Sequence, residues 1–368
     1  VVPRTLWAAV EARSYALTAA LAVWLTVVCV LAALRGGAAL WSLYAFVLAL
    51  AVVSFVYLGL LVFAHVLTLA VIGPRRRLAP LGAAVTAGLV LALPLLTVAA
   101  SQRHQISWID ITGGSGTAVA LWDQWFTHSR LFLCVGSVLL AWGTVVLLRQ
   151  RARGSAAALA VALPWVVVPT ILLIGYSAFF SNIYQPRYLT YTTPGLGLLF
   201  GVCVVAIARH RTRYVVLLVA ILVLSCSTAF VTQRSRYGKP GGADYSVVAD
   251  MIATYARPHD CVIFGSAPRE PLRAIAAARP AAFALLDDVA VGVSGPEAAQ
   301  LWSQDLPLDS DAVRSRLASC AVLWAIVDRQ PDPPLVRAAQ QYQFSVDRRW
   351  ILPRTMVVRL TAQGKMAS

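Results

Sequence analysis

The sequence predicts an α-helical polytopic membrane protein with about eight transmembrane helices, followed by a small C-terminal α/β domain. Of its 368 residues, 59% are apolar and 13% are charged, whereas soluble domains average roughly 45–50% and about 25%. The charges are also uneven, because residues 1–231 hold three acids and 15 bases while residues 232–368 hold 13 acids and 16 bases. An ordinary cytosolic enzyme is therefore excluded. Without a basic stripe on a polar domain, we expect no nucleic-acid partner.

Eight apolar runs are long enough for transmembrane helices, which need about 20 residues to cross about 30 Å of hydrocarbon. They cover residues 16–34, 39–54, 56–73, 79–99, 131–148, 156–178, 188–208 and 214–232. The second and third belong to one long apolar run, which we divide because a single helix of that length would need extreme tilt. If that run is one helix, the number of spans falls to seven.

Arginine-rich loops give the predicted orientation in a bacterial cytoplasmic membrane. Three arginines lie in each of the segments 75–77, 149–153 and 209–213, and Arg35 lies in a shorter connection. By the positive-inside rule these segments face the cytoplasm. The extracytoplasmic side then receives the start of the chain, the break near 53–57, the loops 101–130 and 179–187, and everything after residue 232.

Two domains follow from this division, a transmembrane domain (1–232) and an extracytoplasmic α/β domain (233–368). In the second, β-like runs alternate with helix-like stretches, as in small layered α/β domains. The predicted strands are Cys261–Phe264, Ala282–Leu286, Ala321–Val327 and Thr355–Leu360. The predicted helices are Tyr245–Tyr255, Pro268–Ala278, Asp311–Ala318 and Pro334–Tyr342.

The cysteines follow the same division. Four lie in predicted membrane helices, where they act as small apolar residues. Cys261 and Cys320 each stand at the start of a predicted strand of the C-terminal domain, in a compartment where disulfides persist. We therefore expect these two to form a disulfide. The sequence has no zinc-binding spacing and no CxxC motif.

The rare ionisable residues of the membrane domain gather on its predicted outer side. All three acids of residues 1–231 lie there, with arginines that the positive-inside rule does not require. Such charges are costly beside hydrocarbon unless they are paired or functional. One explanation is an interfacial belt of aromatic rings and snorkelling arginines. The other is a site for an anionic headgroup.

Two of the outer segments favour the headgroup site. Glu11 and Tyr15 are four residues apart and share a helical face, so the carboxylate can orient the phenol or Arg13. Arg187 follows Pro186 near the start of a helix, where the guanidinium and the helix dipole both favour an anion. Two converging arginines, Arg13 and Arg187, could hold a lipid phosphate.

Other polar residues complete the predicted site. Ser101–Ile109 is a polar run whose amide and imidazole groups, with Gln105 and Trp108, could bind sugar hydroxyls. His65, inside an apolar run, is either a buried histidine with satisfied hydrogen bonds or a ligand for the donor. The outer carboxylates are too few and too scattered for a hard-cation site, so we expect no metal and no other cofactor.

Taken in order, these segments resemble the GT-C superfamily of integral-membrane glycosyltransferases, in particular the bacterial relatives of protein O-mannosyltransferases and aminoarabinose transferases. Four family motifs have counterparts: "QEARxYAL" at residues 10–17, "GQxxWI" at 105–109, "RYLxxxxPG" at 187–195 and "DYR" at 244–246. Val10 stands where the family has glutamine, and Ser246 stands where it has arginine.

The resemblance implies transfer of mannose or a related sugar from a polyprenyl-phosphate donor to a glycan or protein hydroxyl, with inversion, on the outer membrane face. It also assigns roles to residues of this chain. Arg13 and Arg187 would hold the donor phosphate, Glu11 would orient Arg13 or Tyr15, and Gln105, Trp108 and Tyr188 would line the sugar or lipid pocket.

One departure concerns the catalytic base. The family's catalytic aspartate lies in the first outer loop, upstream of the "QEAR" segment, and neither Asp110 nor Asp123 occupies that position. We therefore expect the chain to be N-terminally truncated, with the base upstream of Val1. Two alternatives are a non-catalytic polyprenyl-lipid-binding scaffold and a lipid or sugar transporter. A transporter is disfavoured because, apart from His65, the predicted spans lack ionisable residues at mid-membrane depth.

Overall fold

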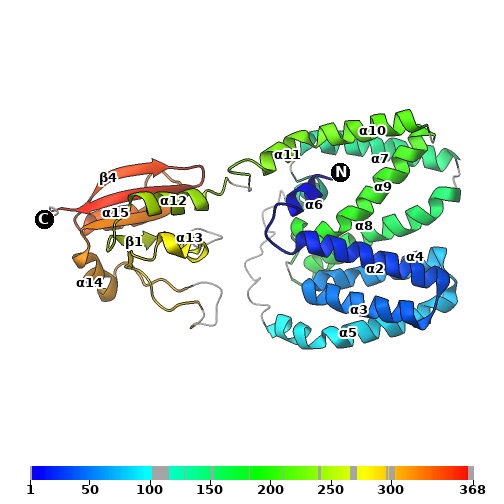
Figure 1. Cartoon of the computed structure of the whole chain (residues 1–368), viewed down its shortest axis with the longest axis horizontal. Helices are drawn as coiled ribbons and strands as arrows, with labels where there is room; N and C mark the ends of the chain where they lie inside the picture. Colours follow the sequence, from blue (N-terminus) through cyan, green and yellow to red (C-terminus); the bar gives the residue numbers. More distant parts are fainter. Residues whose placement is uncertain are drawn as a thin grey trace. The chain divides into compact units, whose positions relative to one another are not determined.

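The computed structural model describes residues 2–101, 116–127, 129–150, 153–181, 183–209, 211–238, 242–265, 272–295, 297 and 303–363. The chain divides into two compact units, Val1–Arg234 and Ser235–Ser368. The first unit is built from helices, and the second contains a five-stranded sheet (Figure 1).

Apolar helices make up most of the first unit. Its α-helices are α1 (Pro3–Ala8), α2 (Tyr15–Arg35), α3 (Ala38–Ser54), α4 (Leu61–Ile72), α5 (Leu78–Ser101), α6 (Gly116–Phe126), α7 (Arg130–Gln150), α8 (Arg153–Phe179), α9 (Thr193–Ala208), α10 (Thr212–Ser225) and α11 (Ser227–Gln233). Short 3-10 helices join some of them: η1 (Val56–Leu60), η2 (Arg75–Arg77) and η4 (Pro186–Thr192). The sequence did not predict α1 and α6, because both are too short to be recognised as membrane spans.

The expected number of eight spans is wrong. In the part of the chain that the structure describes, six helices are long and apolar enough to cross a membrane: Tyr15–Arg35, Arg75–Ser101, Arg130–Arg149, Ser155–Phe179, Pro186–Ala208 and Thr212–Gln233. The predicted spans 39–54 and 56–73 form the shorter apolar helices Ala38–Ser54 and Val56–Ile72. The extended backbone of Phe55 separates them, and the 17 residues of α3 rise only about 26 Å.

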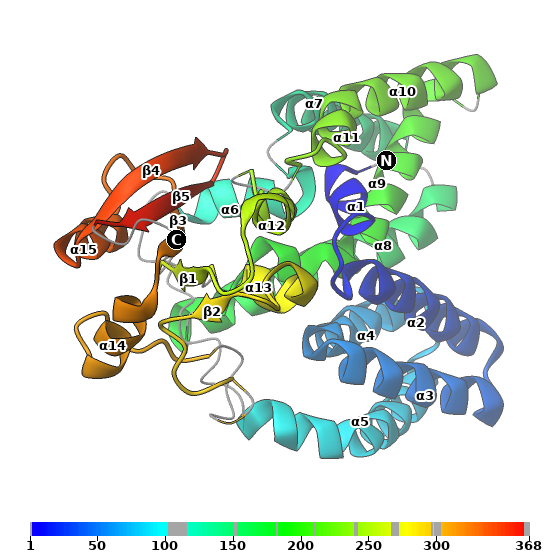
Figure 2. The same ribbon diagram turned by 60° about the vertical axis from the view of Figure 1, so that its left-hand side comes forward.

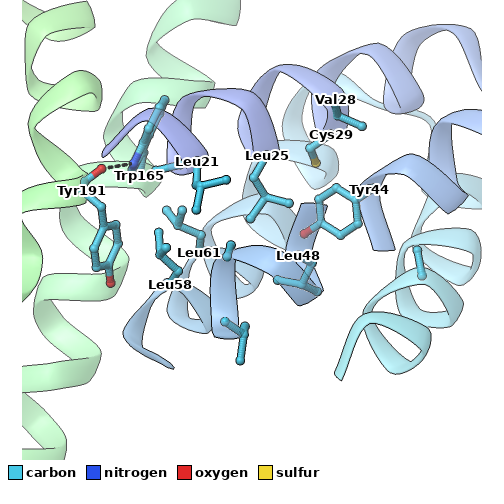
Figure 3. Packing of buried hydrophobic residues seen from close by; sticks show 14 of the residues in the cluster. Leu21, Leu25, Val28, Cys29, Tyr44, Leu48, Leu58, Leu61, Trp165 and Tyr191 are labelled. Atoms are coloured by element: carbon cyan, nitrogen blue, oxygen red, sulfur yellow. Dashed lines mark hydrogen bonds between the residues drawn. The ribbon is translucent and has the colours of Figure 1, made fainter. Parts of the chain in front are cut away.

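The helices pack in two groups that α8 connects. Helix α3 contacts α2 and α5, and α7 contacts α9 and α10, while α8 contacts both α4 and α9 (Figure 1). Figure 3 shows the core of the first group, where Leu21 and Leu25 of α2 meet Tyr44 and Leu48 of α3. In the same view the Trp165 indole donates a hydrogen bond to the Tyr191 carbonyl, at 3.0 Å.

Large apolar side chains also cover the outside of these helices. Leu148 is 74% exposed and Phe179 is 84% exposed, and further leucines, valines and aromatic residues lie open on most of the long helices. A surface of this kind suits lipid rather than water, because lipid solvates apolar side chains while helices satisfy their own backbone groups. With six helices of sufficient length, the first unit is the membrane domain of a multi-pass membrane protein.

Helices α7 and α9 approach each other closely at Gly143, where an added Cβ would lie 2.3 Å from the Cβ of Cys203 and 2.9 Å from its Cα. We expect Gly143→Ala to lower the free energy of unfolding by about 1–3 kcal/mol through overpacking. Gly175→Ala is the matched control, because nothing lies within 4 Å of its added Cβ, and alanine is the better helix former. Thermal unfolding in detergent measures both; equal melting temperatures would contradict the packing described.

The second unit is a mixed sheet with strand order β2-β1-β3-β5-β4 (Figure 2). Its strands are β1 (Cys261–Phe264), β2 (Asp287–Asp288), β3 (Val322–Asp328), β4 (Phe344–Ile351) and β5 (Thr355–Ala362). Strand β1 pairs in parallel with β2 and β3, and β5 pairs antiparallel with β3 and β4. Its helices are α12 (Tyr245–Tyr255), α13 (Ala274–Ala278), η5 (Pro280–Ala282), α14 (Asp311–Ser319) and α15 (Pro334–Gln341).

Both faces of this sheet are covered, which makes three layers. Alternate residues of β3 point to opposite faces, as a strand requires. Leu323 and Ala325 pack in a core with Val313 of α14 and Val336 of α15, whereas Trp324 packs in a second core with residues of α12. The predicted α/β layer pattern is thus confirmed.

Two details of the second unit differ from the sequence prediction. The short strand β2 lies at Asp287–Asp288 rather than at 282–286, and β4 was not predicted. Strand β4 is an edge strand whose centre carries exposed Arg348 and Arg349. Charges of this kind prevent an edge strand from pairing with other chains. They also interrupt the apolar pattern by which a strand is recognised in the sequence. The expected disulfide between Cys261 and Cys320 is present, with a Cα–Cα distance of 5.8 Å.

Candidate anion-binding site

The turn between α1 and α2 brings three predicted site residues together. Arg13 Nε lies 3.6 Å from Glu11 Oε1, and the Arg13 side chain is 53% exposed whereas Glu11 is 10% exposed. Arg13 also hydrogen-bonds the phenol of Tyr15, the first residue of α2. The predicted pairing of Glu11 with Arg13 is therefore found, and the guanidinium is held at the helix start while one side of it faces solvent.

The 3-10 helix η4 carries the second predicted arginine. Pro186 begins η4 with its restricted backbone, and the Tyr188 amide donates to the Gln185 carbonyl at 2.9 Å. The Arg187 guanidinium carbon lies 5.7 Å from the centre of the Tyr188 ring, within cation–π range. Arg187 also acts electrostatically on the Tyr15 phenol. Arg13 and Arg187, which are far apart in the sequence, thus both act electrostatically on the same phenol.

Aromatic rings pack around Tyr15 and Tyr188. Tyr15 packs on Trp7 at a centroid distance of 5.0 Å and on Phe55 at 6.2 Å. Phe55 in turn lies 5.8 Å from Tyr188, and Tyr188 stacks on Tyr57 at 5.1 Å. We call these five rings the aromatic cluster. The aromatic cluster forms an apolar surface beside the two arginines, at one end of the helices.

A buried polar network lies beside the aromatic cluster. Arg4 of α1 is 3% exposed, and its Nη2 lies 3.1 Å from Asp123 Oδ2 of α6. Arg4 Nε donates to the Gln124 carbonyl at 3.0 Å, and the guanidinium carbon lies 4.7 Å from the Trp7 ring centre. Arg4 is therefore the third arginine near Tyr15, with which it also interacts electrostatically.

Burial shifts the proton equilibria of two groups in this network. Burial lowers the pKa of the Arg4 guanidinium, while the neighbouring Asp123 carboxylate acts in the opposite direction. Burial raises the pKa of the Tyr184 phenol, and the charge of Arg4 acts against that shift. The Tyr184 hydroxyl therefore stays protonated and serves as a hydrogen-bond donor.

The structure brings together Glu11, Arg13, Tyr15, Arg187 and Tyr188, which the sequence had proposed as site residues. Two further proposed residues, Gln105 and Trp108, lie outside the described residues. Glu11 and Arg13 lie in the turn before α2 and Tyr15 begins that helix, whereas Arg187 and Tyr188 belong to η4, which leads into α9.

His65 does not join this group, and the structure favours the first of its two interpretations, a buried histidine with satisfied hydrogen bonds. Its Nε2 lies 3.1 Å from Thr26 Oγ1, and its Nδ1 lies 2.9 Å from the Tyr44 hydroxyl. Thr26 stands eleven positions after Tyr15 in α2, which is about 16 Å along the helix. His65 is a buried core histidine with both ring nitrogens satisfied.

Sequence reasoning missed the residues that support the site. Tyr57 was hidden within a continuous apolar run, and Gln124 gives no motif. Arg4 and Asp123 were recognisable only as rare charges, because their partners lie more than 100 positions away. The only signal in the sequence was an aromatic residue near each rare charge, Trp7 three positions after Arg4 and Trp122 next to Asp123.

The chemistry of this arrangement is that of an anion site. Guanidinium groups donate charge-assisted hydrogen bonds to phosphate or carboxylate oxygens, and the start of a helix adds its dipole. Among the residues that the structure describes, no group of three or more histidine, cysteine, aspartate or glutamate side chains could hold a metal ion.

Fold and site together define the class: a multi-pass helical membrane protein with an arginine- and aromatic-rich site at its helix ends, joined to a small α/β domain. No family model, no curated protein and no solved structure matches the chain.

Proposed function

We propose that the protein is a membrane glycosyltransferase that moves a sugar, mannose or a related one, from a polyprenyl-phosphate donor to a hydroxyl of a glycan or protein acceptor. The observation that carries the proposal is that Tyr15 and Tyr188 both pack on Phe55. Arg13 acts on the first of these phenols and Arg187 lies against the second ring. Two guanidiniums at the end of apolar helices suit a phosphate whose lipid chain lies in the membrane. They would also stabilise the charge that develops on the departing phosphate.

The aromatic cluster supports the same substrate class. Tyr57 and Tyr188 are partly exposed and stacked, and Arg187 lies against the Tyr188 ring. Aromatic faces accept both isoprenoid carbons and sugar rings. Glu11 pairs with Arg13 and Asp123 with Arg4, so we assign the acid–base role to neither carboxylate.

The extracytoplasmic side of a bacterial cytoplasmic membrane is the proposed location of the site. Tyr15 and Thr193 begin α2 and α9, whereas Arg35 and Arg209 stand at the other ends of these helices. The positive-inside rule puts the arginine-rich ends in the cytoplasm, and so puts the site outside. The Cys261–Cys320 disulfide supports an oxidising compartment for the C-terminal domain.

Cysteine labelling tests this orientation. We expect Ser181→Cys, between α8 and η4, to react with a membrane-impermeant thiol reagent on intact cells. Thr212→Cys, at the start of α10, should react only after permeabilisation, because it lies beside the arginines at the opposite ends of the helices. Both variants are made with Cys134→Ala, since Cys134 is exposed. Reversed labelling would contradict the proposed orientation.

Sugar transfer is tested with purified full-length protein in proteoliposomes that contain a polyprenyl-phosphate sugar labelled in the sugar. The proposal expects label to move to a glycan or peptide acceptor. Binding of the donor without turnover would indicate a lipid-binding scaffold instead. Movement of intact donor between leaflets, without chemistry, would indicate a transporter. Either result would overturn the proposed reaction.

A further inference from the structure

Helix α6 fastens the segment that carries Arg187 to the rest of the membrane domain. Three consecutive residues of α6 reach three different elements. Asp123 pairs with Arg4 of α1, Gln124 bonds Thr170 of α8, and the Trp125 indole donates to Thr192 Oγ1 of η4 at 3.0 Å. No sequence motif marks this segment.

Gln124 is the centre of these contacts. Its side chain is fully buried. Its Oε1 accepts a hydrogen bond from the Tyr184 hydroxyl at 2.9 Å, and its Nε2 donates to Thr170 Oγ1 at 2.9 Å. Its backbone carbonyl accepts from Arg4 at 3.0 Å. Through its side chain and its backbone carbonyl, Gln124 therefore joins α1, α8 and the segment just before η4.

Tyr184 links Gln124 to the segment that carries Arg187. Tyr184 precedes Arg187 by three residues, and its buried hydroxyl has Gln124 as its acceptor. Tyr184 and Thr192 lie at the two ends of the segment that contains Arg187 and Tyr188, and each forms a hydrogen bond with a residue of α6. When both ends of a short segment are fixed, its side chains lose little conformational entropy on binding a ligand.

We propose that Gln124 is a positioning residue, which through Tyr184 fixes the segment 184–192 so that the Arg187 guanidinium stands ready for a lipid phosphate. This inference rests on the proposed function for the identity of the anion. Gln124 itself touches no substrate. An amide suits the position because it accepts on one side and donates on the other.

Two isosteric variants separate positioning from mere stability. Tyr184→Phe removes the donor to Gln124 Oε1, and Thr170→Val removes the acceptor of Gln124 Nε2. Each leaves one half of the same buried amide unpaired, but only Tyr184 belongs to the segment that carries Arg187. Both are made in the full-length protein in detergent, together with the wild type.

Two measurements are made on each protein. The first is hydrogen–deuterium exchange of the backbone amides of residues 184–192, with α3 as internal reference. The second is the dissociation constant for a polyprenyl monophosphate, with inorganic phosphate in a parallel titration. We expect Tyr184→Phe to speed exchange in 184–192 at least tenfold and to weaken lipid-phosphate binding five- to twentyfold. Thr170→Val should change both less than twofold, at a similar melting temperature.

The outcomes distinguish the two proposals. Equal exchange and binding in the two variants would overturn the positioning role of Gln124, whatever their melting temperatures. If the wild type binds neither phosphate, the proposed function fails, while the exchange comparison still decides whether Gln124 fixes the segment. Binding of inorganic phosphate as tight as that of the lipid would show a free-anion site and would also contradict the proposed donor.

Discussion

Replacing Arg187 with alanine should weaken the binding of a polyprenyl monophosphate about 10- to 100-fold and abolish sugar transfer, while the protein still folds. A charge-assisted hydrogen bond contributes about 1.5–3 kcal/mol, and Arg187 acts electrostatically on the same phenol as Arg13. The Arg187 guanidinium also lies against Tyr188. Titration of the detergent-solubilised variant with the lipid phosphate measures the loss directly.

Arg211→Ala is the matched control for this variant. Arg211 is an exposed arginine just before α10, in the loop at the other end of α9 from the site. We expect its removal to leave the dissociation constant within twofold of the wild-type value. Equal weakening by both substitutions would mean that the lipid phosphate responds to the overall positive charge and that Arg187 has no specific role.

Asp123→Asn should lower the free energy of unfolding by about 2–4 kcal/mol. Removing one partner of a buried ion pair leaves the other charge uncompensated, at a cost of about 3–5 kcal/mol for full burial. Arg4 is almost fully buried, but Asp123 keeps 24% of its side-chain exposure, so we expect a smaller loss. Thermal and denaturant unfolding of the purified protein measure it.

Glu11→Gln provides the comparison for Asp123→Asn. It breaks an ion pair of similar chemistry whose arginine, Arg13, is 53% exposed, and exposed pairs contribute at most about 1 kcal/mol. The account therefore expects a much smaller change in unfolding free energy. If Glu11→Gln lowered the free energy of unfolding as much as Asp123→Asn, the result would contradict the conclusion that the Arg4–Asp123 pair is stronger because it is more buried.

The long helices and the main site residues could be predicted because strong physical constraints act on them locally. A run such as Tyr15–Arg35 is apolar along most of its length and has no charged residue before Arg35, and only a helix satisfies its backbone in lipid. Arg13 and Arg187 were recognisable because an arginine beside hydrocarbon, at a helix end that the topology does not require to be basic, needs a reason to be there.

The supporting contacts could not be predicted, because they depend on which distant segments meet. Gln124 is one polar residue in a helix of eleven residues, and its importance comes from Thr170 and Tyr184. The break at Phe55, by contrast, was predicted by dividing the apolar run into 39–54 and 56–73, and the structure confirms it. Strand β4 is stabilised by pairing with β5 and has no apolar run of its own.

A double-mutant cycle on lipid-phosphate binding tests the central claim most directly. The dissociation constant for a polyprenyl monophosphate is measured for the wild type, Arg13→Gln, Arg187→Gln and the double variant. If the two guanidiniums hold one phosphate, the double variant should bind only slightly more weakly than the weaker single variant, with a coupling of about 1 kcal/mol or more. Strictly additive losses would show that the two arginines act independently and would contradict a shared site.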